Sequence, residues 1–266
     1  MIAEPLSSPG LPPLLKWAGG KRWLIKHLEP YWNKHRERPF VEPFVGGMGV
    51  TLGLRPKTAL LNDANPHLIN FYRWVQQGLH IEIPLVYDRT TYLAYRARFN
   101  QLIRQGRADT AEAAALFYYL NRTGYNGLCR FNASGEFNVP FGKYKTVNYQ
   151  TNFLEYKAVF WGWAFTSGDF SSLDIDPEAF VYADPPYDVE FTQYSPGGFS
   201  WSDQVRLVEF LERHRGPVVI SNQLTDRIYD LYTKSGYTVI TLSAPRRISC
   251  NGNRQDALEV LAFKNI

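Results

Sequence analysis

Apolar residues along the chain fall into short runs typical of strands and longer stretches with helical spacing. A helix is predicted over 22–35, and a short apolar run over 38–45 leads into a cluster of glycines. A second short strand over 58–61 ends in Asn62-Asp63 and precedes a helix over 66–75. A strand, a glycine loop, a helix and a strand that ends in an acid together predict a βαβ unit.

The second half of the chain continues this alternation. Helices are predicted over 202–214 and 223–235, between strands expected at 161–166, 180–183, 218–221, 238–242 and 258–263. This order of elements predicts an α/β sheet that continues to the C-terminus.

The middle of the chain has a different character. Helical periodicity at 92–103 and 110–120 is followed by 121–144, which is dense in Gly, Asn, aromatic residues and Arg. We therefore predict one α/β domain over 1–70 and 151–266, with a mainly helical insert over 71–150 that carries a β-hairpin.

Composition narrows the class of protein only slightly. With 266 residues and 45% hydrophobic content the chain can bury a full core, and it contains neither an apolar membrane span nor a secretory signal, so we expect a cytoplasmic protein. Cys129 and Cys250 lie outside any CxxC pair and are expected to be reduced thiols. The net charge of +4 permits a polyanionic partner without demanding one.

The sharpest motif is DPPY, Asp184 to Tyr187, directly after the apolar run 180–183. In an open α/β sheet, ligands bind beyond the carboxyl ends of the strands, so Asp184 is expected to face a cleft. Pro185 and Pro186 stiffen the turn. A carboxylate and a backbone carbonyl that accept hydrogen bonds from both N–H groups of an amine would free its lone pair for attack. Tyr187 could stack on a base. A bare DPPY is equally compatible with a capped turn.

Two further loops suit a nucleoside-like ligand. The glycines after Phe44, beginning at Gly46, let a backbone approach a ligand closely, and Asp63 stands where an acid binds ribose hydroxyls. No GxxxxGK[ST] phosphate loop is present. The turn 167–170, with Asp169 and Phe170, is placed to hold an adenine ring, although it is also compatible with a plain turn.

The segment 121–145 has the composition of a DNA-reading loop. Arginine is the commonest bidentate reader of guanine, asparagine suits adenine, and apolar groups contact the thymine methyl. Tyr125 or Phe131 could wedge between bases, while Arg122 and the lysines near its end could contact phosphates. A hairpin with solvated charges is the alternative interpretation.

With these residues in view, the chain resembles the adenine-N6 DNA methyltransferases of the bacterial and phage Dam family, in the α arrangement. The family's motifs occur in order over about 14–263: KWAGGK, EPFVGG, NDAN, NRTGYNGLCRFN, GEFNVPFGKYK, GDF, DPPY, VISN and RRISCNG. The resemblance implies a Rossmann-like sheet with a target-recognition insert, S-adenosylmethionine as cofactor, no metal, and double-stranded DNA as substrate, with the adenine of GATC flipped into the DPPY pocket. It implies no obligatory protein partner, and leaves open a host, phage or restriction-modification setting.

The resemblance also implies roles for individual residues. The expected catalytic set is Asp184, Pro185, Pro186 and Tyr187. The expected cofactor contacts are Trp17, Lys21, Phe44, Gly46, Asp63, Asp169, Phe170 and Asp184. The expected DNA contacts are Lys16, Arg122, Tyr125, Asn126, Leu128, Arg130, Pro140, Lys143 and Tyr144.

Two positions depart from the family pattern. Met48 stands where many relatives have glycine, and we expect Gly47 and Gly49 to absorb the change. Lys143 stands where close relatives often carry arginine, and lysine lacks the planar fork of arginine, so a phosphate or base contact is expected to differ.

Other functions fit less well. Cytosine C5 methylation needs a Pro-Cys nucleophile, which is missing, and cytosine N4 enzymes usually carry serine where this chain has Asp184. A dehydrogenase would leave DPPY and the recognition loop unexplained. RNA adenine methylation and a catalytically silent DNA-binding module remain alternatives; the first differs in substrate, and the second would bind cofactor without turnover.

Overall fold

One mixed sheet of seven strands organises the protein. The computed structural model describes residues 10–188, 198–244 and 257–266. The strand order is β3-β2-β1-β4-β5-β7-β6, and all neighbours are parallel except β7, which is antiparallel to β5 and β6. The strands are β1 (Phe40–Glu42), β2 (Ala59–Asp63), β3 (Trp163–Ser167), β4 (Phe180–Ala183), β5 (Val218–Gln223), β6 (Thr238–Ala244) and β7 (Ala257–Lys264).

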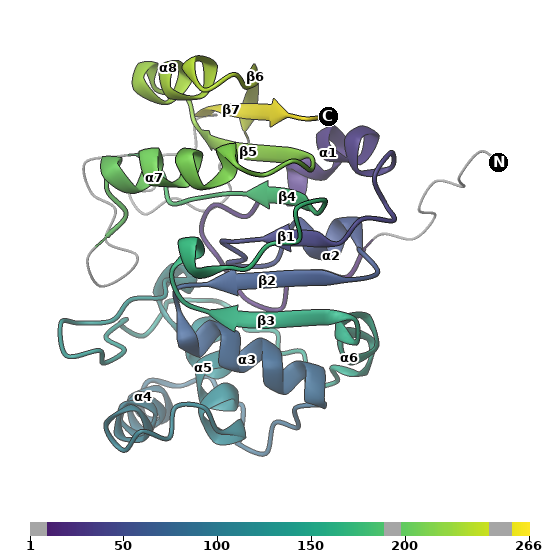
Figure 1. Cartoon of the computed structure of the whole chain (residues 1–266). Helices are drawn as coiled ribbons and strands as arrows, with labels where there is room; N and C mark the ends of the chain where they lie inside the picture. The colour runs from purple at the N-terminus through teal and green to yellow at the C-terminus, as the bar shows by residue number, and fades with distance from the viewer. Residues whose placement is uncertain (1–9, 189–197, 245–256) are drawn as a thin grey trace.

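This order confirms the predicted Rossmann-like α/β class. The chain winds outward from β1 to β3 and then returns to pair β4 with the other side of β1, so the strand order reverses between β1 and β4. Ligands bind beyond the carboxyl ends of the strands at such a reversal. In Figure 1 the arrowheads of β1 to β4 all point to the left, which marks that edge of the sheet.

Helices cover both faces of the sheet (Figure 1). Alternate residues of β4 belong to different hydrophobic clusters, because side chains of a strand point to opposite faces in turn: Phe180 and Tyr182 pack with the first, Val181 and Ala183 with the second. The first cluster includes α1 (Ile25–Trp32), α2 (Thr51–Leu54), α3 (Pro66–Gln77), α5 (Ala111–Thr123) and α6 (Leu154–Phe160). The second includes α7 (Trp201–Glu212) and α8 (Asp226–Lys234).

Local signals explain where α3 and α7 begin and end. The Asn65 side chain accepts hydrogen bonds from the backbone N–H groups of His67 and Leu68, Pro66 takes the first helical position, and Gly78 ends α3 with φ of 98°. Ser200 and Asp203 form a capping box at the start of α7.

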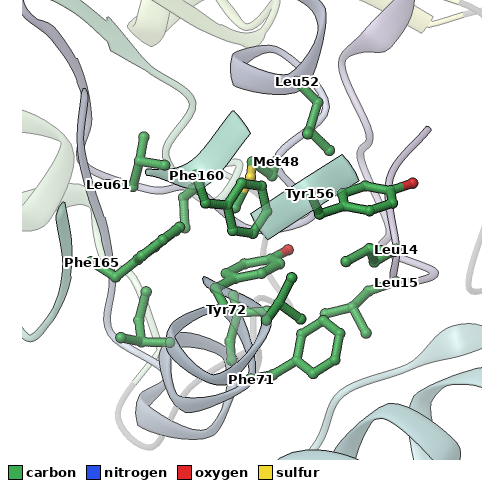
Figure 2. Packing of buried hydrophobic residues seen from close by; sticks show 14 of the residues in the cluster. Leu14, Leu15, Met48, Leu52, Leu61, Phe71, Tyr72, Tyr156, Phe160 and Phe165 are labelled. Atoms are coloured by element: carbon green, nitrogen blue, oxygen red, sulfur yellow. The ribbon is translucent and has the colours of Figure 1, made fainter. Parts of the chain in front are cut away.

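Met48 is a core residue with an unusual backbone. Its φ is 58°, in the left-handed region that favours glycine, and its side chain is fully buried. Figure 2 shows it among Leu52, Tyr72 and Phe160. The methionine therefore contributes packing at a position whose conformation costs a non-glycine residue about 1 kcal/mol. The expectation that Gly47 and Gly49 absorb its presence stays a prediction.

The segment predicted as an insert packs directly on the rest of the molecule. It holds α4 (Arg89–Arg104) and α5, and α5 packs against α3 within the first hydrophobic cluster. Where a β-hairpin was expected, the structure has only two isolated antiparallel bridges, Gly124↔Phe141 and Phe131↔Phe137. The division into 1–70, 71–150 and 151–266 stays a prediction.

Candidate active site at the carboxyl edge of the sheet

The DPPY motif begins where β4 ends, as expected. The Ser221 hydroxyl on β5 donates a 2.8 Å hydrogen bond to Asp184 Oδ1, and the Lys21 ammonium lies 3.2 Å from the same oxygen. The Tyr182 hydroxyl lies 2.8 Å from Ser221 Oγ and extends this chain. Asp184 is thus held by groups from the neighbouring strand and from the segment before the 3₁₀-turn η1 (Arg22–Leu24).

Burial makes Asp184 a better proton acceptor than an ordinary aspartate. Burial raises its pKa, and the negative charge of Glu259 adds to the rise, while the Lys21 ammonium and the Ser221 hydroxyl oppose it. A carboxylate with a raised pKa that keeps part of its surface open, here 20% of the side chain, can accept a proton or a hydrogen bond from a ligand.

Lys21 is a buried cation shared by two acids. Its side chain is only 4% exposed, and Nζ lies 3.2 Å from Asp184 Oδ1 and 3.3 Å from Glu259 Oε1. It also bonds to the Tyr187 hydroxyl, which in turn donates to Glu259 Oε1. The structure therefore brings Lys21, Asp184 and Tyr187 together, and adds Glu259, which the sequence did not single out.

A second network fixes the backbone of the motif. The Gln204 side chain on α7 is buried; its amide donates a 2.8 Å hydrogen bond to the Pro186 carbonyl, and its oxygen accepts from Asn222. Asn222 Nδ2 also reaches the Tyr232 hydroxyl at 3.0 Å. Within the described residues the Pro185 carbonyl accepts no such bond. Gln204 thus occupies the Pro186 carbonyl and leaves the Pro185 carbonyl available.

Replacing Gln204 with leucine, which removes no charge, is expected to lower the rate of the methyl transfer that the sequence predicts. The change leaves the Pro186 carbonyl and Asn222 without this partner, which costs about 1–3 kcal/mol, and it loosens the turn that aims Asp184. The rate and the melting temperature should be measured together against Gln105→Leu, a change at the exposed end of α4. A Gln204→Leu enzyme with the wild-type rate would show that this network does not orient the motif.

The glycine loop is shaped by Trp17. A Cβ on Gly46 would lie 2.7 Å from Trp17 Nε1, and a Cβ on Gly47 would lie 2.7 Å from Trp17 Cβ. Gly46 has φ of 43°, and its N–H donates to Asp63 Oδ2 at 3.0 Å, while Asp63 Oδ1 accepts from the Asn65 N–H. Asp63 therefore organises the loop, and burial raises its pKa although both backbone bonds oppose the rise.

Glu42 is a further buried acid at this edge. Its carboxylate accepts a hydrogen bond from the Thr51 hydroxyl. Burial raises its pKa well above the ordinary value, and the charges of Asp184 and Asp63 add to the effect. The sequence placed Glu42 in a motif without giving it a role.

The turn 167–170 brings aromatic rings and an acidic side chain together. Phe170, in the turn η3 (Phe170–Ser172), is buried, and its ring lies 5.4 Å from that of Phe44 and 6.1 Å from that of Phe199. Arg206 on α7 pairs with both oxygens of Asp169 and lies 4.5 Å from the Phe170 ring. This guanidinium holds the pKa of Asp169 well below its ordinary value, so the carboxylate stays ionised.

These residues fit S-adenosylmethionine. Asp63, Asp169 and Asp184 provide acceptors for hydroxyl, amino and cationic groups, and Phe44 and Phe170 provide ring faces. A positively charged nucleoside without phosphate matches an edge where acids outnumber cations, whereas a dinucleotide pyrophosphate does not.

Three of the expected DNA contacts are held by the protein itself. Lys16 Nζ donates to the Arg122 carbonyl at 2.7 Å and lies 3.4 Å from the centre of the Tyr144 ring. Burial and the Arg122 charge lower the pKa of Lys16 to about 8. Arg122 donates to the Asn148 carbonyl, and the Tyr144 hydroxyl to that of Gly124. These residues shape the loop in this structure; DNA contacts by them stay predictions.

Other members of the set are accessible. Tyr125, Arg130, Pro140 and Lys143 are exposed, whereas Asn126 and Leu128 are partly buried. Arg130 Nε donates to Asn138 Oδ1 at 2.8 Å, which orients the guanidinium. In Figure 1 the teal loop that follows α5 protrudes on the same side as the strand arrowheads. The loop predicted to read DNA and the carboxyl ends of the strands thus lie toward one side of the molecule.

Some sequence features lie elsewhere. Cys129 is a free thiol whose sulfur accepts from the Asn65 amide, and burial raises its pKa to about 12, which favours the protonated thiol. Cys250 and the RRISCNG motif (246–252) lie outside the described residues. Among the helices that the structure describes, none is long and apolar enough to cross a membrane.

Comparison with known proteins agrees with the chemistry of this edge. A family model described as D12 class N6 adenine-specific DNA methyltransferase matches residues 17–248. The chain is 36% identical to a DNA adenine methylase of Vibrio cholerae, covering 94% of each chain, and 35% identical to the DNA adenine methylase of Escherichia coli K12 over 94% of that protein.

One relative is much longer. The DNA N-6-adenine-methyltransferase of Escherichia phage P1 is 37% identical over 90% of this chain, which spans about a third of the phage protein's length. Among solved structures, an RNA methyltransferase from Pyrococcus horikoshii described as putative has 9% identity and a TM-score of 0.42, covering 99% of this chain and 92% of that one.

Proposed function

The chain belongs to the D12 class of N6 adenine-specific DNA methyltransferases, and on that premise we propose that it methylates adenine in the sequence GATC of duplex DNA, after the base leaves the helix. S-adenosylmethionine is the methyl donor of this reaction. When bound, it supplies a methyl carbon activated by a positively charged sulfur.

The observation that carries the proposal is the geometry of Asp184. The N6 nitrogen of adenine is a poor nucleophile because its lone pair is delocalised into the ring. Ser221 and Lys21 fix Asp184, which can accept a hydrogen bond from one N–H group of this amine. Because Gln204 already occupies the Pro186 carbonyl, the Pro185 carbonyl is the group that can accept from the other N–H. Such bonds favour a pyramidal nitrogen whose lone pair is free to attack in line.

The remaining residues are proposed to bind the methyl donor, the target base and DNA. Phe44 and Phe170 would contact the adenine ring of the donor, and Asp63 its ribose hydroxyls. Tyr187, anchored through its hydroxyl, would stack on the extrahelical target base. We assign donor binding also to Trp17, Lys21, Gly46 and Asp169, and DNA contacts to Lys16, Arg122, Tyr125, Asn126, Leu128, Arg130, Pro140, Lys143 and Tyr144.

Arg130 is proposed to read a guanine edge. Asn138 orients its guanidinium and leaves other N–H groups to donate. Arg130→Ala is expected to relax preference at one base pair by about 1–3 kcal/mol, measured as kcat/KM on single-base variants of GATC. A uniform loss across all duplexes would make Arg130 a phosphate contact. Arg36→Ala, in the turn that precedes the amino end of β1, provides the control.

The proposal is tested with labelled methyl donor. Duplexes with GATC, with each single-base variant and without GATC should be compared with a structured RNA, followed by digestion and nucleoside identification. N6-methyladenine confined to GATC duplexes supports the reaction and its target. N6-methyladenine at other sites would refute the GATC assignment and direct attention to Lys143, and label only in RNA would refute the substrate.

A further inference from the structure

Glu259 is a buried acid that none of the predicted roles uses. It lies on β7, opposite Gln223 of β5 and Leu242 of β6, and only 7% of it is exposed. Burying a carboxylate inside a sheet is costly unless its oxygens are paired. Oε1 accepts from the Tyr187 hydroxyl and pairs with Lys21 at 3.3 Å, whereas Oε2 has no hydrogen-bond partner among the described residues.

We propose that Glu259 is a positioning residue for methyl transfer, which holds the Tyr187 ring in place and draws the Lys21 ammonium away from Asp184. The proposal rests on the function proposed above, because it concerns how Asp184 and Tyr187 are presented to the target amine.

Tyr187 is anchored at the far end of its ring. Its hydroxyl contacts both Glu259 and Lys21, so the far end of the ring is tied to β7 while its backbone is tied to β4. Two fixed ends set the plane of the ring, and stacking on a base requires that plane. A base-stacking tyrosine held at only one end would sample other rotamers.

Glu259 also competes with Asp184 for the charge of Lys21. Lys21 Nζ lies 3.2 Å from Asp184 and 3.3 Å from Glu259, so the ammonium is shared almost equally. Without the Glu259 charge, the ammonium would be attracted to Asp184 alone and would occupy the oxygen lone pairs that the amine needs. The Glu259 charge also helps to raise the pKa of Asp184, so neutralising Glu259 lowers that pKa and weakens Asp184 as an acceptor.

Glu259→Gln removes no other titratable side chain near Asp184. Among the described residues, the titratable groups that face Asp184 besides Glu259 are Lys21, Glu42 on β1, Tyr182 on β4, Tyr187 and Tyr232 on α8. Because the pKa of Glu42 is also raised by burial and by the Asp184 charge, the Asp184–Glu259 coupling is read from the difference between the acid limbs of the Glu259→Gln and wild-type rate profiles. Since Asp184 acts as a carboxylate, the rate falls as pH drops through its pKa, and a lower pKa moves that limb to lower pH.

The test compares Glu259→Gln, Glu259→Asp and Tyr187→Phe with the wild type in single turnovers on a GATC duplex, at saturating DNA and methyl donor, over a range of pH. We expect Glu259→Gln to lower the rate about 100-fold with little change in DNA affinity, and to move the acid limb to lower pH. Glu259→Asp keeps the charge and should return the limb toward the wild-type position. Combined with Tyr187→Phe, Glu259→Gln should cost less than the product of the two single effects.

The outcomes separate this proposal from the proposed function. Adenine methylation by the wild type with an unchanged rate and limb in Glu259→Gln would overturn the role of Glu259 alone. So would a loss of rate that tracks a loss of folded protein, with no shift of the acid limb in Glu259→Gln and no coupling to Tyr187. Failure of the wild type to methylate adenine would overturn the proposed function instead.

Discussion

Replacing Asp184 with alanine is expected to reduce the rate of methyl transfer by about 10²–10⁴-fold while the protein stays folded. The substitution removes the only acidic side chain of DPPY, and with it the acceptor held by Ser221 and Lys21. Lys21 retains Glu259 as a partner, so no buried cation is left alone. The rate should be measured in single turnovers at saturating donor and DNA, so that binding does not mask the chemical step.

Matched variants make this result specific. Asp184→Asn keeps the shape of the side chain but replaces one acceptor oxygen by a donor, and we expect a loss close to that of alanine. Asp174→Ala removes an exposed aspartate shortly before β4 and should leave rate and melting temperature unchanged. A rate for Asp184→Ala within about threefold of wild type would exclude Asp184 from the mechanism.

Replacing Lys21 with methionine is expected to destabilise the fold by about 3–5 kcal/mol. The ammonium is buried and is shared by Asp184 and Glu259, so its loss leaves two neighbouring carboxylates facing each other. Because Lys21 lowers the pKa of Asp184, its removal raises that pKa further above the unfolded value. A carboxyl with a raised pKa favours the folded state when protonated, so the loss of stability should grow as pH rises.

Denaturant unfolding at pH 5 and pH 8 measures this effect. The deficit of Lys21→Met relative to wild type should be larger at pH 8. Lys26→Met, which replaces an exposed lysine on α1, should stay within about 0.5 kcal/mol of wild type at both values. A Lys21→Met protein as stable as wild type at both pH values would show that the buried carboxylates do not depend on this cation.

The sheet was predictable because its signals are local. The strand predicted over 180–183 has those bounds in the structure, and α3 begins at Pro66, as predicted. A proline at the first position and an asparagine before it are features that a sequence shows directly. The helices α2 and α6 were not predicted, because four and seven residues give too little periodicity to detect.

The contacts within the site were less predictable because they join distant parts of the chain. Lys16 exchanges hydrogen bonds with Asn121, 105 positions away, and Lys21 reaches Glu259 across 238 positions. Glu259 appears in the sequence as one acid in an apolar strand, and Gln204 as one amide in an amphipathic helix, so neither carries a motif. Their alignment with DPPY follows only from the strand order and register.

The segment 121–145, predicted to read DNA, was also only partly predictable from the sequence. Its composition predicted DNA contacts, which stay a prediction, and the structure places Tyr125, Arg130 and Lys143 at the surface. The expected hairpin is reduced to two bridges. A few backbone bonds cross the loop, and side chains take other backbone groups: Asn100 pairs with the backbone of Phe137, and Tyr92 and Arg96 donate to the Val139 carbonyl. Side-chain bonds of this kind compete with a regular ladder.

The central claim is that the amine of adenine, oriented by Asp184, takes the methyl group directly, without a covalent intermediate on the protein. The most direct measurement uses S-adenosylmethionine with a chiral methyl group and a GATC duplex, followed by isolation of N6-methyladenine and determination of its methyl configuration. A single in-line displacement predicts inversion. Retention would require two displacements through a protein nucleophile and would contradict the account.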